Sequence, residues 1–198
     1  MSIIPRKQPT QARAQERVQR ILKTAERLLA NEGYEVFSTN RVAKEAEVNI
    51  ASLYQYFPNK QALIFAINRK MLDDVLELFA EFEQSWKDHN WKDVLDILTA
   101  DILTSNQHIR LVKALDQAAA QSPELQAMEW QHAESLSRFY SRLLKHYGSS
   151  WSESDRLNAG RMIYAMGTMG LYDAGHLPKP DQQRILQLFK MNIEQFIE

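Results

Sequence analysis

The chain has 198 residues, of which 44% are hydrophobic and 25% charged, and it contains no cysteine. This length and composition suit a folded globular protein with a substantial core, and they exclude collagen-like, disulfide-stapled and wholly disordered chains. The lack of cysteine also excludes thiolate catalysis and thiolate-bound metals. The first ten residues contain no apolar run, so we expect no secretory signal. The longest weakly polar stretch, 157–175, contains Arg161 and Asp173 and predicts a buried helix instead of a membrane span, so we expect a cytoplasmic protein that does not enter a membrane.

The formal net charge of −1 conceals an uneven distribution. Residues 1–70 contain twelve Lys and Arg and six Asp and Glu, a balance of +6, whereas residues 71–198 contain twelve and nineteen, a balance of −7. A basic end on an acidic body is typical of a polyanion-binding domain joined to a domain with another role. Scattered surface charges would give a similar imbalance, so charge by itself does not decide the function.

Apolar residues recur at helical spacing along nearly the whole chain, and the sequence contains no alternating run long enough for a strand. We therefore predict an all-α fold of about nine helices. The predicted helices cover approximately residues 10–31, 40–46, 50–57, 60–86, 91–104, 108–120, 123–147, 153–175 and 181–197. The change of charge near residue 70 predicts one domain over 10–70 and a second over 71–198.

The segment 38–60, STNRVAKEAEVNIASLYQYFPNK, is the most informative part of the sequence. It predicts two short helices on either side of a tight turn at Glu47–Val48. Helices this short are stable only when they pack on neighbours, here the helices predicted over 10–31 and 60–86. This is the plan of a helix-turn-helix, in which the second helix presents its amino-terminal side chains to the major groove of DNA. The alternative is a helix pair inside a helical body that does not bind DNA.

Leu53 and Phe57 are expected to face the core, which leaves the opposite face of the second short helix for DNA. Small side chains on that face permit close approach to base edges, aliphatic ones contact thymine methyl groups, and Gln55 suits adenine. Tyrosine hydroxyls and the helix starts at Thr39 and Lys60 suit phosphate groups. The residues expected to point outward are Asn49, Ile50, Ala51, Ser52, Gln55 and Tyr56.

Residues 13–72 resemble the DNA-binding domain of TetR-type transcriptional regulators. The matching residues are Ala25–Glu26, Leu28–Leu29, Gly33–Tyr34, Ser38–Thr39, Val42–Ala43, Ala46, Val48, the run SLYQYF at 52–57, Asn59–Lys60 and Leu63. The resemblance implies an all-helical homodimer whose first three helices bind an operator and whose carboxy-terminal helices bind an effector and the sister subunit. We therefore expect a repressor that binds a pseudo-palindromic double-stranded operator and is released by a small apolar or aromatic effector.

The family pattern also implies individual roles. Thr39, Tyr54 and Lys60 correspond to phosphate contacts, and Arg41 is expected to meet the DNA backbone. The positions that correspond to base-facing residues are Asn40, Ile50, Ala51, Ser52 and Gln55. One departure is Glu47, because the family usually has glycine at this point of the turn, where the backbone is left-handed. A non-glycine residue in that conformation costs about 1 kcal/mol.

The predicted helix over 123–147 carries an apolar stripe that includes one histidine. Most of its large side chains are expected to form core, but methionine and aromatic residues also suit the wall of a ligand pocket with a few polar groups. The expected pocket residues are Met128, His132, Phe139, Met162, Met166 and Tyr172.

The last two predicted helices carry small residues on one and an apolar stripe on the other. Pairing them with their symmetry mates would form a four-helix bundle. The residues expected at this dimer interface are Gly160, Gly167, Ile185, Phe189 and Phe196. The alternative is that both faces are buried within one subunit.

The sequence contains no nucleotide-binding glycine-rich loop, no His-Glu-x-x-His motif and no nucleophilic serine elbow, and its five histidines are scattered. We therefore expect no catalytic residues, no metal and no other cofactor. Two alternatives stay open. One is a DNA-binding regulator of the same fold without an effector, acting as an activator or in chromosome organisation. The other is a helical carrier or enzyme that has lost DNA binding.

Overall fold

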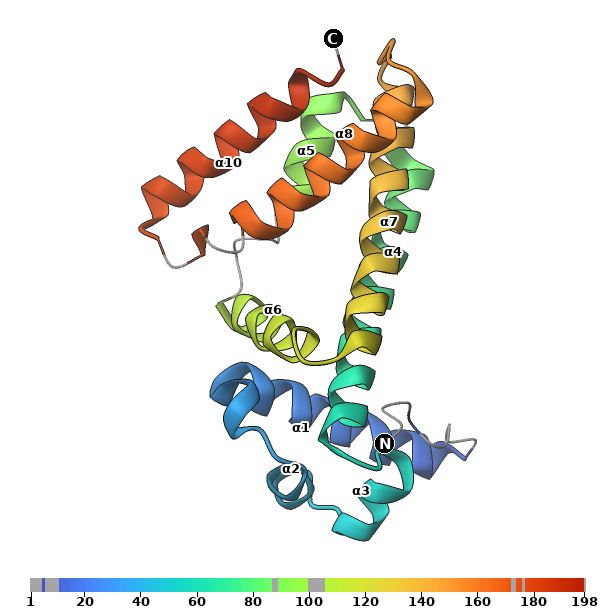
Figure 1. Cartoon of the computed structure of the whole chain (residues 1–198), viewed down its shortest axis with the longest axis vertical. Coiled ribbons are helices and arrows are strands. Elements are labelled where there is room, and N and C mark those ends of the chain that lie inside the picture. Colours follow the sequence, from blue (N-terminus) through green and yellow to red (C-terminus); the bar gives the residue numbers. More distant parts are fainter. Residues whose placement is uncertain are drawn as a thin grey trace. The chain divides into compact units, whose positions relative to one another are not determined.

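The computed structural model describes residues 5, 11–86, 89–99, 106–171, 174–175 and 177–197. Within them the chain forms nine α-helices, one π-helical segment and no strand (Figure 1), so the all-α prediction is confirmed. The elements are α1 (Ala12–Val36), α2 (Thr39–Glu45), α3 (Ile50–Tyr56), α4 (Lys60–Ser85), α5 (Trp91–Thr99), α6 (Asn106–Ala119), α7 (Pro123–His146), α8 (Glu153–Ala165), η2 (Met166–Leu171) and α10 (Lys179–Glu194). No helix in this described part is long and apolar enough to cross a membrane.

The chain forms two compact units, each described here by itself. The amino-terminal unit comprises residues 1–73 and 110–129, and the carboxy-terminal unit comprises residues 74–109 and 130–198. The amino-terminal unit therefore contains most of α6 and the start of α7 in addition to α1, α2, α3 and the first half of α4. The functional division at residue 70 stays a prediction.

The amino-terminal unit has one continuous apolar core, to which each of its helices except the short α2 contributes a fully buried large side chain. These side chains are Ile21, Leu29, Leu53, Leu63, Ile64, Leu115 and Leu125. In α1 the buried residues recur at three- and four-residue spacing, which is the expected pattern for an amphipathic helix. Helix α2 contributes only the smaller Val42 and Ala43.

Polar side chains begin several helices at the predicted positions. Ser38 Oγ accepts from the Arg41 amide at 3.4 Å, Asn49 Oδ1 from the Ala51 amide at 2.8 Å, and Asn59 Oδ1 from the Ala62 amide at 2.7 Å. Such caps satisfy amides that have no partner inside the helix, and each stabilises the helix by about 1 kcal/mol. The helix starts were therefore readable from the sequence.

A polar pair lies inside the amino-terminal unit. The side chain of Asn68 on α4 is completely buried, and its Nδ2 donates to Glu129 Oε1 on α7 at 2.6 Å. Burial raises the pKa of Glu129, the hydrogen bond from Asn68 opposes this change, and the charge of Asp116 on α6 adds to it. The carboxyl group is therefore more easily protonated in the folded chain than in the unfolded chain.

The Asn68–Glu129 pair makes the free energy of unfolding depend on pH. An acid whose pKa is raised by folding stabilises the folded state below its unfolded pKa, and that contribution is lost as the pH rises from about 4.5 through the folded pKa. We predict that Glu129→Gln removes this loss, so the stability of the variant relative to the native chain increases with pH above 4.5. Urea unfolding at a series of pH values measures the difference.

The matched control for this experiment is Glu16→Gln, which changes an exposed glutamate of α1 in the same unit. It should leave the pH profile of the native chain unaltered. A constant difference between Glu129→Gln and the native chain at every pH would contradict the assignment.

The carboxy-terminal unit has two apolar clusters. One joins α5, α7, α8 and α10 through buried residues including Leu144, Ile163 and Ile193, and the other joins the end of α4 to α5 and α7. In the second cluster the rings of Phe79 and Phe139 lie edge to face, with centroids 4.7 Å apart. The spacing of Leu63, Ile67, Met71 and Val75 predicts that Leu78 also faces inward, but Leu78 is 57% exposed. A helix has 3.6 residues per turn, so its inward face shifts gradually relative to a fixed repeat in the sequence. Over the 26 residues of α4 this shift places Phe79 inward instead of Leu78.

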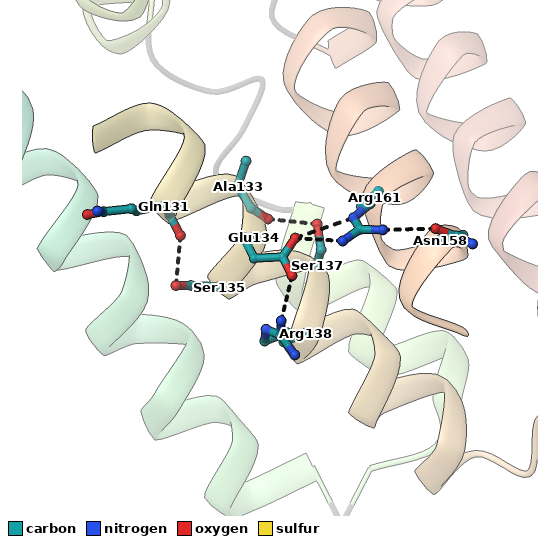
Figure 2. A network of polar contacts seen from close by, with 8 residues as sticks. All are labelled: Gln131, Ala133, Glu134, Ser135, Ser137, Arg138, Asn158 and Arg161. Carbon is teal, nitrogen blue, oxygen red and sulfur yellow. Dashed lines mark hydrogen bonds and ion pairs between the residues drawn. The ribbon is translucent and has the colours of Figure 1, made fainter. Parts of the chain in front are cut away.

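Helices α7 and α8 approach each other very closely where Gly160 meets the backbone of Ser137. A Cβ on Gly160 would overlap the backbone oxygen of Ser137 and would come within 3.0 Å of its carbonyl carbon. Figure 2 shows the polar side of this crossing, where Glu134 on α7 accepts from Arg138 on its own helix at 2.7 Å and from Arg161 on α8 at 3.1 Å. Arg161 also donates to Asn158 Oδ1 at 2.9 Å. The glycine permits the approach, and the ion pairs border it.

The helix predicted over 153–175 is shorter than expected. Helix α8 ends at Ala165, and the chain continues as the π-helical segment η2 through Leu171. The segment MGTMGL contains two glycines and a threonine, which are weak formers of α-helix. A Cβ added at Gly167 would lie 3.6 Å from the ring of Phe189 on α10, which is an ordinary van der Waals distance.

The close α7–α8 crossing gives a prediction. Gly160→Ala should lower the free energy of unfolding by about 1–3 kcal/mol, because the added methyl group meets backbone that cannot rotate away. Gly170→Ala is the control, because a Cβ there meets no described atom within 4 Å outside its own helical segment and its two chain neighbours. Thermal unfolding of both variants tests this, and an equal change in the two would contradict it.

Candidate nucleic-acid interface

The turn between α2 and α3 is a helix C-terminus closed by backbone hydrogen bonds. The Val48 amide donates to Ala43 O at 3.0 Å, and the Glu47 amide donates to Lys44 O at 3.2 Å. This is the Schellman pattern, which requires a left-handed residue at the position of Glu47. Glu47 has φ 53, so the predicted left-handed conformation at this departure from glycine is confirmed. The helix-turn-helix keeps its turn at a local conformational cost.

Helix α3 presents most of the expected residues outward. Asn49, Ala51, Tyr54 and Gln55 are exposed, and Ile50 and Ser52 are partly buried. Leu53 is completely buried and Phe57 is 2% exposed, which confirms the predicted inner face. The exposed residues form a polar face of small and hydrogen-bonding side chains, which has the chemistry required for reading base edges.

The structure corrects the predicted orientation of Tyr56. It was expected on the outer face of α3, but its side chain is 7% exposed and it belongs to the core of the amino-terminal unit. Its position three residues after Leu53 places both on the same side of the helix. Its ring lies 6.5 Å from that of Phe57. The spacing from Leu53 was visible in the sequence and contradicted the outward assignment.

The two short helices are linked by a hydrogen bond between hydroxyl groups. Thr39 Oγ1 at the start of α2 lies 3.1 Å from the Tyr54 hydroxyl on α3. Thr39 is 8% exposed and Tyr54 is 39% exposed, so the pair lies at the edge of the core with the tyrosine reaching the surface. Asn40, the next residue of α2, is exposed. These groups can offer hydroxyl and amide donors to an anion or a base edge.

Lys60 makes a local contact in the free chain. Its Nζ donates to the backbone oxygen of Tyr34 at 2.5 Å and lies 4.2 Å from the centre of the Tyr34 ring. Burial lowers the pKa of Lys60, and the charge of Glu35 opposes this change. The ammonium group therefore joins the start of α4 to the end of α1. Its expected contact with a phosphate stays a prediction.

Arg41 is exposed, but its side chain forms ion pairs with two glutamates. Its guanidinium group lies 2.9 Å from Glu32 on α1 and 3.2 Å from Glu45 one turn further along α2. The four-residue spacing from Arg41 to Glu45 is a recognisable helical pair in the sequence. The contact with Glu32 comes from another helix, and sequence analysis did not find it.

The expected pocket residues lie in different surroundings. Met128 belongs to the core of the amino-terminal unit, Phe139 to the cluster of α4, α5 and α7, and Met166 packs against the cluster of α5, α7, α8 and α10. Met162 is 54% exposed, and its expected place in a pocket stays a prediction. His132 is buried with its ring 6.1 Å from that of Tyr164. Tyr172 lies outside the described residues.

The residues expected at the dimer interface are largely used within the chain. Gly160 serves the α7–α8 crossing, Phe189 is 8% exposed, and Ile185 and Phe196 pack against the same cluster as Phe189. Gly167 faces the ring of Phe189. Gly160 and Phe189 are buried within the chain, whereas Gly167, Ile185 and Phe196 are only partly buried, and the expected dimer interface stays a prediction. The exposed apolar side chains of the same helices are Met162 on α8 and Leu188 and Met191 on α10, at 54%, 42% and 55%.

Among the described residues, no three His, Asp or Glu side chains gather as ligands for a metal ion. The polar contacts at the helix-turn-helix are hydrogen bonds and ion pairs within the chain, some between two side chains and others between a side chain and the backbone. The fold and this site together define a helix-turn-helix protein.

Comparison with known proteins specifies the type. Residues 21–67 match the family model described as "Bacterial regulatory proteins, tetR family". An HTH-type transcriptional regulator from Staphylococcus aureus (strain USA300) is 33% identical over 73 residues, which are 37% of this chain and 40% of that protein. The chain thus matches about two fifths of the length of this relative.

Solved structures match over nearly the whole length. A TetR transcriptional regulator from Legionella pneumophila has a TM-score of 0.71 and 18% identity, covering 97% of this chain and 100% of that one. A transcriptional regulator from Rhodococcus sp. Rha1 has a TM-score of 0.75 and 20% identity, covering 90% and 95%. Residues 21–67 thus match the model of the tetR family's amino-terminal domain, and the chain has the fold of these two solved structures over 90% or more of its length.

Proposed function

We propose that the chain is a DNA-binding transcriptional repressor that binds a pseudo-palindromic operator as a homodimer in the cytoplasm. The observation that carries the proposal is the geometry of α3. A capped helix of seven residues is fixed by Leu53 in the core and presents Asn49, Ala51 and Gln55 to solvent. The match of residues 21–67 to a family of regulators, and not of enzymes, supports the same function.

DNA binding is tested with duplexes selected by the native chain from a randomised pool. Affinity should fall steeply between 50 and 200 mM salt, because phosphate contacts release condensed cations. Gln55→Ala should lower discrimination at one base pair by about 1–3 kcal/mol and leave other positions unchanged. Electrophoretic mobility shift with single-base variants of the duplex measures both effects.

The control for this substitution is Gln126→Ala, which changes an exposed glutamine on α7 of the same unit. It should alter neither affinity nor base preference. Failure of the native chain to retain any duplex at low salt would contradict the proposed function and would favour a carrier that has lost DNA binding.

The homodimer follows from the operator, because two helix-turn-helix units read half-sites about 34 Å apart. The exposed face of α10 supports it. Leu188 and Met191 are three residues apart and so lie on one side of the helix, where neither is covered within the chain. Met162 adds a third exposed apolar side chain on α8. We propose that these three exposed residues meet their counterparts in the second subunit.

Leu188→Glu should weaken the dimer at least about tenfold, because it places a charge in an apolar contact. Sedimentation over a range of protein concentrations measures the dissociation constant. Gln183→Glu, an exposed position of the same helix, should leave that constant unchanged. A native chain that sediments as a monomer at every concentration would contradict the proposed dimer.

We further propose that a small apolar or aromatic effector, bound by the carboxy-terminal helices, releases the operator. The large aromatic content of the cluster around Phe139 supports this step, with Phe79, Trp86 and Tyr140 in ring contact with it. One observation favours a regulator without an effector: the expected pocket residues do not share one cluster, since Met128 belongs to the core of the amino-terminal unit and Phe139 to the cluster of α4, α5 and α7. Dissociation of the operator complex by such compounds distinguishes the two candidates.

A further inference from the structure

Four charged side chains join α1 to α2, and we call them the α1–α2 ion-pair network: Arg27, Glu32, Arg41 and Glu45. Arg41 Nη2 lies 2.9 Å from Glu32 Oε1, and Arg41 Nε lies 3.2 Å from Glu45 Oε1. The other oxygen of Glu45 lies 2.5 Å from Arg27 Nη2. Two guanidinium groups and two carboxylates alternate, so the network carries no net charge within a basic unit.

Glu32 is the member that most requires its partner. Its side chain is 15% exposed, and its Oε2 is buried without a hydrogen-bond partner. A carboxylate removed from water is costly to keep charged unless a cation and hydrogen bonds compensate. Arg41 supplies the compensation at Oε1. Moving the guanidinium group of Arg41 away to a phosphate would leave Glu32 without its cation.

Glu45 holds the same guanidinium group from the other side. Hydrogen bonds from Arg27 and then Arg41 lower the pKa of Glu45, so the carboxyl group is charged at neutral pH. The Nε and Nη2 atoms of Arg41 are thus directed to two different carboxylates on two helices. The planar fork of arginine allows this, whereas the single ammonium group of lysine does not reproduce it.

The position of α2 matters for α3. With seven residues, α2 is too short to be stable by itself, and its buried side chains, Val42 and Ala43, are small. Its first residue, Thr39, is hydrogen-bonded to Tyr54 on α3. A contact that fixes α2 on α1 therefore also fixes the frame in which α3 presents its outer face.

We propose that Arg41 is a positioning residue that holds α2 on α1 through Glu32 and Glu45, and that it does not neutralise a DNA phosphate. This inference rests on the proposed DNA binding and replaces the phosphate role expected for Arg41 from the family pattern.

The sign of one substitution distinguishes the two roles. Glu32→Gln removes a negative charge from the DNA-binding unit, so electrostatics by itself predicts tighter binding to every duplex. If Arg41 were a phosphate contact, freeing it would tighten binding further. Positioning predicts the opposite for specific DNA. We expect Glu32→Gln to weaken binding to the selected duplex about tenfold or more, with binding to a random-sequence duplex unchanged or tighter.

Two variants of Arg41 complete the test. Arg41→Lys keeps the charge and Arg41→Met removes it, and both lose the fork. We expect both to lower the ratio of selected to random affinity about tenfold or more, and neither to reduce the slope of log affinity against log salt by the ~0.9 that one lost phosphate contact gives. Lys44→Met, an exposed position of α2, calibrates the effect of removing one charge from the same helix.

The ratio separates positioning from simple loss of folding, because unfolded protein lowers specific and non-specific binding together. Circular dichroism and thermal unfolding of each variant check the folded fraction. Arg41→Lys with native affinity for the selected duplex, a salt slope reduced by about 0.9 in Arg41→Met, or tighter selected binding by Glu32→Gln would each overturn the inference. Failure of the native chain to bind any duplex would instead overturn the proposed function, and this inference with it.

Discussion

The helix-turn-helix depends on burial of a few side chains in a shared core, because neither of its helices can be stable alone. Helices α2 and α3 have seven residues each, about two turns, and nucleation of so short a helix is unfavourable in water. Leu53 is completely buried, as is Val42. Burial in the apolar core that they share with residues of α1 and α4 supplies the free energy that the local sequence lacks. The outer face of α3 is available for recognition because its inner face is fully committed.

Polar contacts then fix the rotation of α2, which the apolar core leaves undetermined. Valine and alanine side chains bury α2 without specifying its rotation closely, since small side chains interlock weakly. The Thr39–Tyr54 hydrogen bond and the contacts of Arg41 with Glu32 and Glu45 set that rotation through directional geometry. The left-handed conformation of Glu47 closes the turn at a cost that the surrounding hydrogen bonds offset. Placement of α3 is thus a joint result of apolar burial and oriented polar groups.

Sequence reasoning succeeded where the controlling interaction is local and failed where it is not. The helix starts near Ser38 and Asn59, the left-handed position of Glu47 and the inner face at Leu53 follow from neighbours in the chain, and they were predicted. Tyr56 was misplaced although its spacing from Leu53 indicated burial, which was an error of interpretation. The contact between Arg41 and Glu32 and the approach of Gly160 to Ser137 join separate helices, and no local pattern specifies them.

The composition of the amino-terminal unit bears on how the helix-turn-helix is supported. Its core is not a three-helix core, because Leu115 of α6 and Leu125 of α7 are as fully buried as Leu53 of α3. The Asn68–Glu129 hydrogen bond adds a directional link between α4 and α7 in the same interior. Interiors packed at crystal-like density do not absorb displacement of one element without moving its neighbours. Within this unit, a shift of α6 or of the start of α7 must therefore change the packing of the apolar core that α3 and α4 share with them.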